Sequence, residues 1–182
     1  MSASEYDLMA PIGARIVPLY GVLAAGRVAL VDEADYELVM ERRWNVHERI
    51  QPSGSTHGPY AATSSRDGRN STLHMHKLIT GYAITDHKNH HGLDNQRSNL
   101  RPATGVQNAA NSRKQPNCTS KYKGVCWFEP TGEWMASIRV HGKKSFLGFF
   151  VSEEDAAMTY DAVAFAVWDN YALLNLPARA VA

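Results

Sequence analysis

Short β-rich runs dominate the first third of the chain, where apolar positions recur at the spacing of strands rather than of long helices. Four such runs predict strands, at residues 16–20, 27–31, 44–49 and 60–63. Residues 35–42 predict a helix with Leu38 and Val39 turned inward. Residues 51–59, rich in Ser, Gly and Pro, predict a loop. The N-terminal part is therefore expected to be short strands around one helix.

The middle of the chain is more polar and holds two helix signals. Residues 73–79 predict a short helix that is ended by Gly81. Thr104, followed by Gln107, matches a capping box that starts a second helix. The polar, proline-containing residues 114–121 predict a linker between two domains.

The C-terminal part predicts three strands joined by tight turns and followed by one helix. The expected strands are residues 122–128, 133–140 and 144–150, with turns at Thr131-Gly132 and His141-Gly142. Ser152 and Asp155 cap a helix that runs to about Trp168. Its apolar stripe consists of Ala156, Ala157, Tyr160, Ala164 and Val167.

Alternation along the strands separates a face toward this helix from an outward face. In the second strand the helix-facing set is Trp134, Ala136, Ile138 and Val140, and the outward set is Met135, Ser137, Arg139 and His141. In the third strand, Leu147 and Phe149 are expected to face inward, and Lys144 and Phe146 outward. Trp127 in the first strand is expected to belong to the core.

The composition, with 44% apolar and 20% charged residues, is typical of a globular protein. No window approaches the roughly 18 consecutive apolar residues of a membrane span, and the N-terminus lacks a secretory signal pattern. We therefore expect no membrane partner. Cys118 and Cys126 form no Cys-x-x-Cys pair, which predicts neither a disulfide framework nor a zinc knuckle. A reducing, cytoplasmic setting is expected.

The net charge of +1 divides unevenly along the chain. Residues 1–85 carry a net −1, residues 86–150 carry +6, and residues 151–182 carry −4. A basic middle indicates a polyanionic partner, although uneven surface charge alone would give the same pattern.

The polar middle also contains the residue types that phosphodiester hydrolysis requires. His87 follows Asp86, Asn99 lies 12 residues after His87, and Asn108 lies 9 residues after Asn99. Histidine supplies a base near neutral pH, and Asp and Asn oxygens suit Mg²⁺. In isolation such residues are typical of turns and surface caps. Together, just before a capped helix, they indicate an active site.

This stretch resembles the HNH nucleases found among phage and intron homing endonucleases. The matching residues are 73–79, 86–87, 92–95, Arg97, 99–101 and Asn108. The resemblance implies a ββα-metal core over about residues 72–113, with one divalent metal ion held by Asp86 and Asn108. It also implies that His87 is the general base and that Asn99 braces the hairpin and orients His87.

The chain departs from that family at Asn89-His90-His91. Extra imidazoles near a metal would favour Mn, Ni or Zn, or would contact phosphate instead. A zinc-stabilised structural module built on His87, His90 and His91 is a rival interpretation, but it lacks paired cysteines. Mg²⁺ is therefore the expected ion, with Mn²⁺ or another transition metal as the alternative.

Other basic and imidazole residues are expected to have supporting roles. Lys77, Arg97, Arg101 and Arg113 are candidate phosphate contacts, with surface ion pairing as the alternative for each. His74 and His76 lie two apart on the predicted helix and would not share a face. We expect His74 on the surface and His76 in packing or phosphate contact. No function is assigned to His47, His57 or His141.

The C-terminal pattern resembles the AP-two (ethylene-response-factor) DNA-binding domain over essentially all of residues 120–177. The resemblance rests on residues 122–125, 134–139, 146–150, 156–164 and 174–177. It implies a sheet that enters the major groove and a helix that backs it. We expect the DNA contacts to come from Lys123, Arg139, Lys144 and Phe146. Cys126 and Phe128 replace arginines of the plant domains, which predicts poorer guanine readout.

These patterns predict an α+β protein with an HNH nuclease domain at residues 10–113 and an AP-two-type domain at residues 122–177. The predicted function is metal-dependent cleavage of DNA of the homing type, in the host cell of a phage or mobile element. The alternative is a non-catalytic, sequence-specific DNA-binding regulator with an inert HNH remnant. The expected partner is double-stranded DNA, and a monomer is expected, with a dimer left open.

Overall fold

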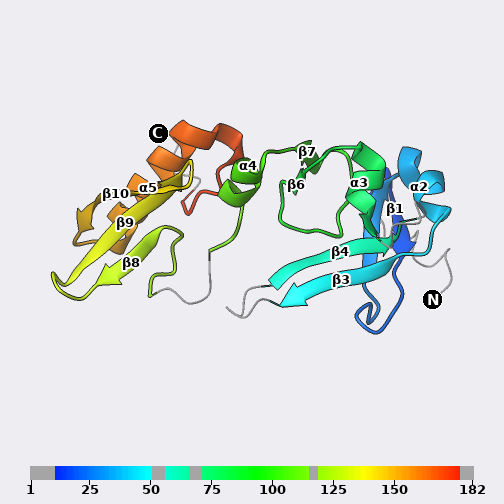
Figure 1. Cartoon of the computed structure of the whole chain (residues 1–182), viewed down its shortest axis with the longest axis horizontal. Coiled ribbons are helices and arrows are strands. Elements are labelled where there is room, and N and C mark those ends of the chain that lie inside the picture. The colour runs from blue at the N-terminus through cyan, green and yellow to red at the C-terminus, as the bar shows by residue number, and fades with distance from the viewer. Residues whose placement is uncertain (1–10, 51–55, 66–70, 115–118, 177–182) are drawn as a thin grey trace. The chain divides into compact units, whose positions relative to one another are not determined.

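A computed structural model describes residues 11–50, 56–65, 71–114 and 119–176 of the chain (Figure 1). The chain divides into two compact units, Met1–Ala103 and Thr104–Ala182. Both units combine small antiparallel sheets with a few helices, so the protein has the mixed α and β character that the sequence predicts.

The described residues of the first unit form three small sheets, each antiparallel. Strands β1 and β2 form a hairpin, β3, β4 and β5 form a three-stranded sheet, and β6 pairs with β7. The elements are β1 (Ala14–Pro18), β2 (Val28–Asp32), α2 (Glu33–Met40), β3 (Asn45–Ile50), β4 (Thr56–Ser64), β5 (Thr72–His74), α3 (Met75–Thr80), β6 (Thr85–His87) and β7 (Leu100–Pro102).

The core of the first unit forms around Trp44, which is fully buried and whose indole N–H donates to the carbonyl of Val39 at 2.8 Å. Val39 is buried as predicted, but the inward placement of Leu38 is wrong, because Leu38 remains 40% exposed. An eight-residue helix offers the core only a narrow stripe, and Asp35 occupies part of that stripe.

Two local predictions in the first unit need correction. Strand β4 begins at Thr56, inside the predicted loop, and residues 51–55 of that loop lie outside the described residues. The helix predicted at residues 73–79 begins only at Met75, because His74 has extended backbone angles and pairs with Ala62 as the end of β5. The helix ends at Gly81, whose φ of 70° provides the left-handed cap.

The second unit is a three-stranded antiparallel sheet in the order β10-β9-β8, with helix α5 packed on one face (Figure 1). Its elements are α4 (Gly105–Ala110), β8 (Val125–Phe128), β9 (Glu133–Val140), β10 (Lys143–Phe150), α5 (Glu153–Trp168) and the 3-10 turn η1 (Asp169–Tyr171). The strands, the turns and the Ser152 cap of α5 are confirmed within one to three residues.

The helix-facing side of the sheet contacts the predicted stripe of α5. Ala156, Ala157, Tyr160 and Ala164 are buried against the sheet, whereas Val167, also assigned to the stripe, is 40% exposed. Tyr160 lies so close to Gly124 that an added Cβ there would meet the tyrosine ring. Gly124 also has a φ of 80°, so this approach of strand and helix requires glycine.

Helix α4 belongs to the second unit and starts with the predicted capping box of Thr104 and Gln107. The ββα-metal arrangement expected over residues 72–113 has no support here, because its hairpin, β6–β7, and its helix, α4, fall in different units. Of the predicted linker 114–121, residues 115–118 and with them Cys118 lie outside the described residues. Within the part of the chain that is described, no helix is long and apolar enough to cross a bilayer.

Candidate functional site

The outward face of the β8–β9–β10 sheet is the side that α5 does not cover. Arg139 of β9 lies opposite Lys144 of β10, and both side chains are exposed. Arg139 also donates from Nη1 to the carbonyl of Gly142 at 2.8 Å, which holds its guanidinium near the β9–β10 turn. Two adjacent cations therefore lie at one end of this face, where the sequence places two of its DNA contacts.

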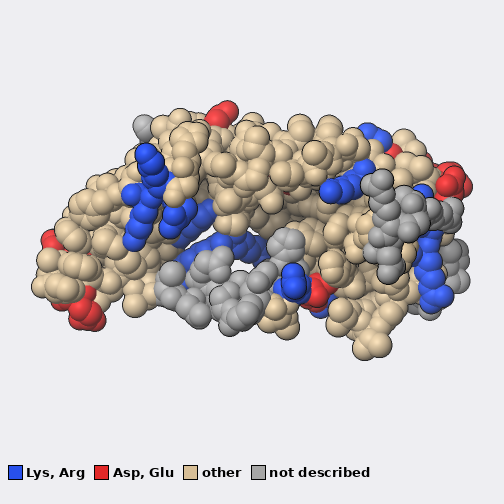
Figure 2. All heavy atoms as spheres, viewed as in Figure 1, with Lys and Arg blue, Asp and Glu red and all other residues tan. Residues whose placement is uncertain are grey.

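Charge is polarised along the second unit. Figure 2 shows Lys and Arg side chains gathered near the β9–β10 turn and acidic side chains near the opposite, β8–β9 end of the sheet. At the N-terminus of α5, Glu154 pairs with Lys121 at 3.2 Å and Glu153 accepts from the hydroxyl of Ser120 at 2.7 Å. These carboxylates are thus engaged with partners close to the helix.

An irregularity in β10 sets which aromatic residues face outward. Phe146 lies opposite Ser137 and Gly148 lies opposite Ala136, so Leu147 is one residue more than β9 requires. The predicted inward orientation of Phe149 is therefore wrong: it lies opposite Met135 and is 40% exposed, while Leu147 and Phe150 pack against the core. The bulge moves Phe149 to the same face as Phe146.

Trp127 faces the other way. It lies opposite Trp134, with the two ring centroids 5.1 Å apart in an edge-to-face arrangement, and Trp134 packs on the α5 side of the sheet. Trp127 therefore lies on the α5 side of the sheet, but it is only half-buried and belongs to neither core cluster of the second unit, so its core placement stays a prediction.

Lys123 lies away from the outward face. Its ammonium donates to the carbonyls of Ala110 at 2.6 Å and Ser112 at 2.8 Å, at the C-terminal end of α4. A cation at this end satisfies carbonyls that a helix leaves without partners. Burial lowers the pKa of Lys123 to about 8. The geometry gives Lys123 a structural contact, and its expected DNA contact stays a prediction.

A polar clamp that the sequence did not reveal fixes the C-terminal segment of the second unit. The buried carboxylate of Asp161 accepts from the backbone N–H of Asn175 at 2.9 Å and of Leu176 at 2.7 Å. The side chain of Asn175 in turn contacts both the N–H and the carbonyl of Lys123. The clamp thereby ties the start of the sheet to α5.

In the first unit, the predicted metal ligand Asp86 is buried in an ion pair. Its Oδ2 lies 2.7 Å from Arg101 Nη2, and the side chains are only 4% and 12% exposed. This pairing also turns Arg101, an expected phosphate contact, toward a carboxylate. Breaking such a buried pair would leave an uncompensated charge, which indicates that the pair is structural.

Asn99 braces the loop between β6 and β7. Its Oδ1 accepts from the N–H of Asn89 at 3.0 Å, and its Nδ2 donates to the carbonyl of Asp94 at 2.8 Å. The loop that contains His90 and His91 is therefore held from inside. Orientation of His87 by Asn99 stays a prediction.

The structure brings four histidines into one row, which the sequence did not predict. His47 Nδ1 lies 3.2 Å from His74 Nε2, the rings of His74 and His76 stack at 5.2 Å, and those of His76 and His87 meet edge to face at 5.1 Å. The predicted separation of His74 from His76 is therefore wrong, because His74 belongs to β5 and not to a helix; His74 itself is half-buried. His76 is buried, in agreement with a packing role.

Burial is the largest influence on the pKa values of His76 and His87 in this row. It lowers the pKa of His76 to about 3, with His87, His74 and Lys77 adding repulsion. It also lowers the pKa of His87, against the opposing effects of Asn95 and Asp86. Tyr60 contacts the rings of three of these histidines, and burial raises its pKa.

The described residues offer few side chains that could bind a metal ion together. None of their His, Cys, Asp and Glu side chains form a group of three or more that could hold one. Asp86 is already paired with Arg101, and Asn108 is an exposed residue of α4 in the other unit. These residues do not fit the expected Mg²⁺ site, and binding of a divalent ion stays a prediction.

The remaining candidate phosphate contacts, Arg97, Lys77 and Arg113, differ in whether their side chains are already engaged with other residues or exposed. Arg97 forms two hydrogen bonds, of 2.7 and 2.8 Å, with the carboxylate of Asp35, and donates to the carbonyl of Ile79. Its guanidinium therefore joins α2 to α3. Lys77 and Arg113 are exposed, and they stay predictions as phosphate contacts.

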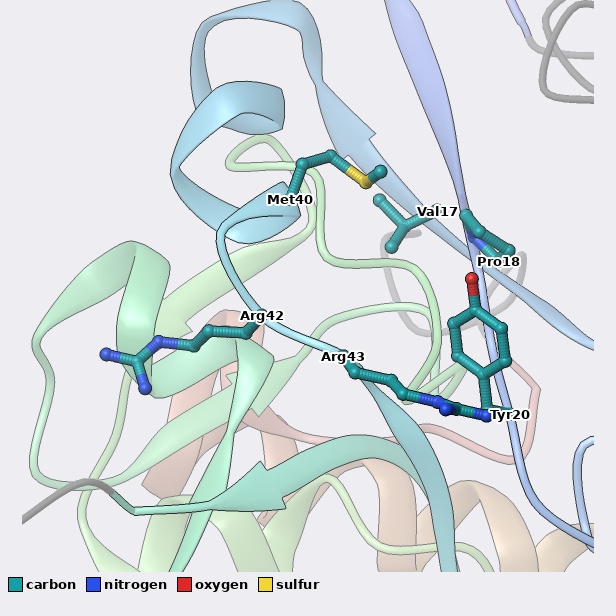
Figure 3. A pocket seen from close by; sticks show the side chains of 6 residues that line it. All are labelled: Val17, Pro18, Tyr20, Met40, Arg42 and Arg43. Atoms are coloured by element: carbon teal, nitrogen blue, oxygen red, sulfur yellow. The ribbon is translucent and has the colours of Figure 1, made fainter.

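The first unit also has a shallow pocket of about 320 Å³ that no sequence pattern indicated (Figure 3). Its lining consists of Val17, Pro18, Tyr20, Met40, Arg42 and Arg43. The guanidinium of Arg43 lies 4.2 Å from the centroid of the Tyr20 ring, while Arg42 points away from that pair. The pocket is thus bounded by three apolar side chains, Tyr20 and two arginines, one of which is stacked on Tyr20.

Comparison with known proteins adds one relative. Over 66 residues the chain is 38% identical to dehydration-responsive element-binding protein 2E of rice (Oryza sativa subsp. japonica), a match that covers 34% of this chain. The chain spans 20% of the length of that relative. No protein-family model and no solved structure matches the chain.

This similarity supports an AP-two-type DNA-binding domain, as the C-terminal pattern predicts. The same comparison corrects the prediction of an HNH endonuclease, because the relative is an element-binding protein and not an endonuclease. The phage or mobile-element setting likewise has no support. What the chain shares with this relative is a stretch of 66 residues, and a role in binding DNA is taken up below as a proposal.

Proposed function

We propose that this protein is a non-catalytic DNA-binding regulator that contacts double-stranded DNA through the outward face of β8–β9–β10. The observation that carries this proposal is the adjacent, exposed pair of Arg139 and Lys144 on a sheet face that α5 leaves open. A two-stranded ribbon such as β9–β10 has the width that the major groove admits. The name of the rice relative, an element-binding protein, agrees with this role.

In this proposal the first unit has a structural role and no catalytic role. Arg101 neutralises Asp86, and Asp35 engages Arg97, so two of the conspicuous arginines of that unit hold carboxylates. The resemblance of residues 73–108 to a nuclease motif then corresponds to an inert remnant. Lys77 and Arg113 remain available as additional phosphate contacts.

Anisotropy of a labelled duplex, measured over a range of salt concentrations, tests the proposal with Arg139→Ala and Lys144→Ala. Each substitution is expected to weaken binding roughly 10-fold and to reduce the slope of log affinity against log salt by about 1, because one phosphate contact is lost. Lys121→Ala is the matched control: it removes the same charge from an exposed residue that pairs with α5. That variant should bind like the wild type.

Two results would contradict the proposal. The first is an unchanged affinity and salt slope in the Arg139→Ala, Lys144→Ala double variant whose thermal unfolding is normal. The second is nicking of supercoiled plasmid in Mg²⁺ or Mn²⁺ that His87→Ala abolishes, since a regulator of this kind leaves DNA intact.

A further inference from the structure

Three phenylalanines form a patch on the outward face of the sheet, next to the basic pair. Phe146 and Phe149 are 58% and 40% exposed, and their ring centroids lie 5.0 Å apart. Phe128 of β8 lies 5.1 Å from Phe149 by the same measure. We call Phe128, Phe146 and Phe149 the aromatic patch. None of the three belongs to the core clusters of the second unit.

The backbone of β10 places two of these rings on the outward face. Phe146 and Phe149 are three residues apart and would face opposite sides of a regular strand. The extra residue Leu147 and the φ of 142° at Gly148 place both rings outward. A contiguous apolar surface created by a local irregularity indicates a binding role, because solvent alone would favour polar residues there.

The neighbours of the patch favour a nucleic acid as its occupant. Phe146 lies opposite Ser137, and two residues away on each strand Lys144 lies opposite Arg139. Glu133 lies opposite Phe128 at the other end of the patch, so the cations adjoin the Phe146 end. The phosphate backbone is polyanionic, and its bases present one apolar group in the major groove, the 5-methyl group of thymine. Phenylalanine is a side chain that contacts this methyl group in protein–DNA complexes.

The shape of the patch distinguishes methyl contact from insertion between bases. The rings pack on one another at interplanar angles of 59° and 33°, so they form one continuous set. Apolar wedges that unstack base steps are inserted by proteins that bind the minor groove, whereas a two-stranded ribbon such as β9–β10 fits the major groove. A mutually supported set of rings instead offers a broad apolar surface to the groove floor.

We propose that the aromatic patch contacts thymine 5-methyl groups in the major groove, so that the protein prefers thymine-containing duplexes over the same duplexes made with uracil. The inference rests on the DNA binding proposed above and names the chemical group that the same face recognises. Phe146, the most exposed ring, makes the largest contribution, and Phe128 and Phe149 support it from the side.

The test uses the whole chain and one randomised duplex pool, amplified either with dTTP or with dUTP. The wild type is expected to bind the thymine pool more tightly, by roughly 4-fold for each methyl group removed from water. Phe146→Ala is expected to bring the two affinities together. Phe165→Ala, which truncates an exposed phenylalanine on α5, is the matched control and should keep the wild-type ratio. Equal thermal unfolding of the two variants excludes a folding effect.

The outcomes separate this inference from the proposed function. Equal binding of both pools by the wild type, while Arg139→Ala weakens both, overturns methyl recognition and leaves DNA binding intact. Tighter binding to single strands of the pool than to either duplex also overturns it, since the rings then stack on bases. Failure to bind any of these DNAs overturns both proposals.

Discussion

At the scale of single residues, His76 links the packing of the first unit to pH. Its ring is buried between the imidazoles of His74 and His87, and the buried Nδ1 finds no hydrogen-bond partner among the described residues. Protonation would place a charge in a site that burial and neighbouring positive groups already disfavour. The pKa in the folded chain is therefore about 3, below the ordinary value of 6.5.

Acid is expected to destabilise the first unit through this residue. Between pH 6.5 and about 3 the unfolded chain binds a proton that folded His76 does not, so stability falls as the pH falls. The loss from about pH 7 to about pH 5 should reach about 2 kcal/mol for one such group. Urea unfolding followed by the NMR signal of the Trp44 indole N–H measures it, because that group is buried in the first unit.

A variant separates titration of His76 from general acid sensitivity. His76→Phe keeps a ring in the row but cannot take up a proton, and it should lose much of the pH dependence even if it unfolds more easily. His141→Gln, at an exposed position, should retain that dependence. An undiminished dependence in His76→Phe would show that other groups cause it.

Residue roles could be predicted from the sequence only where they depend on near neighbours. The capping pair Thr104 and Gln107 was identified because its partners lie three apart. The partners of Asp86 and Lys123 were not, because which cation meets a buried carboxylate, or which carbonyls meet a lysine, is decided by tertiary contacts. The histidine row was missed for the same reason, since β3, β5, α3 and β6 each supply one ring.

At the scale of elements, strand β10 shows how one residue decides the chemistry of a face. Its bulge depends on Gly148, whose φ of 142° is costly for any residue with a Cβ. An added Cβ would also lie 3.1 Å from the ring of Phe150. Closing the bulge would turn Phe149 toward the core and Phe150 toward solvent.

Gly148→Ala is expected to destabilise the second unit by about 1–3 kcal/mol, through backbone strain and the crowded Phe150 ring. Thermal unfolding followed by circular dichroism measures this loss. Gly105→Ala is the control, because that glycine opens α4 with a negative φ and nothing within 4 Å of an added Cβ. A Gly148→Ala variant as stable as the wild type would show that the bulge does not need glycine.

Strands and turns of the second unit were predictable because alternation and turn residues are local signals. In the strands of this unit, alternation predicted the wrong orientation only for Phe149. The extra residue Leu147 shifts the alternation by one position, and the apolar pattern of the sequence does not reveal that shift. In the first unit the short helix α3 was extended too far toward its N-terminus, because pairing of His74 with Ala62 is a long-range contact.

At the scale of the whole molecule, each unit has a core of its own. Among the described residues, the cluster around Trp44 consists of residues up to Leu100, and the clusters under α5 consist of residues from Tyr122 onward. Contiguous apolar burial within each unit is the usual requirement for independent folding.

The segment of residues 104–182 is therefore expected to fold alone and to bind duplex DNA within about 3-fold of the affinity of the full chain. Circular dichroism during urea unfolding and duplex anisotropy measure the two properties. A folded segment with much weaker binding would assign part of the DNA contact to residues before Thr104. An unfolded segment would show that the second unit depends on the first.

The bulge in β10 has a consequence for how this chain is aligned with others. Leu147 is surplus to the pairing with β9, so a relative could lose that one codon and still keep both Phe146 and Phe149 pointing outward. Loss of a codon before or after Leu147 would instead turn the side chains of part of β10 to the opposite side of the sheet. An alignment of this chain with a bulge-free homologue thus needs a gap in the middle of a strand, where gap penalties are normally highest. Without that gap, outward residues of one protein are matched to core residues of the other.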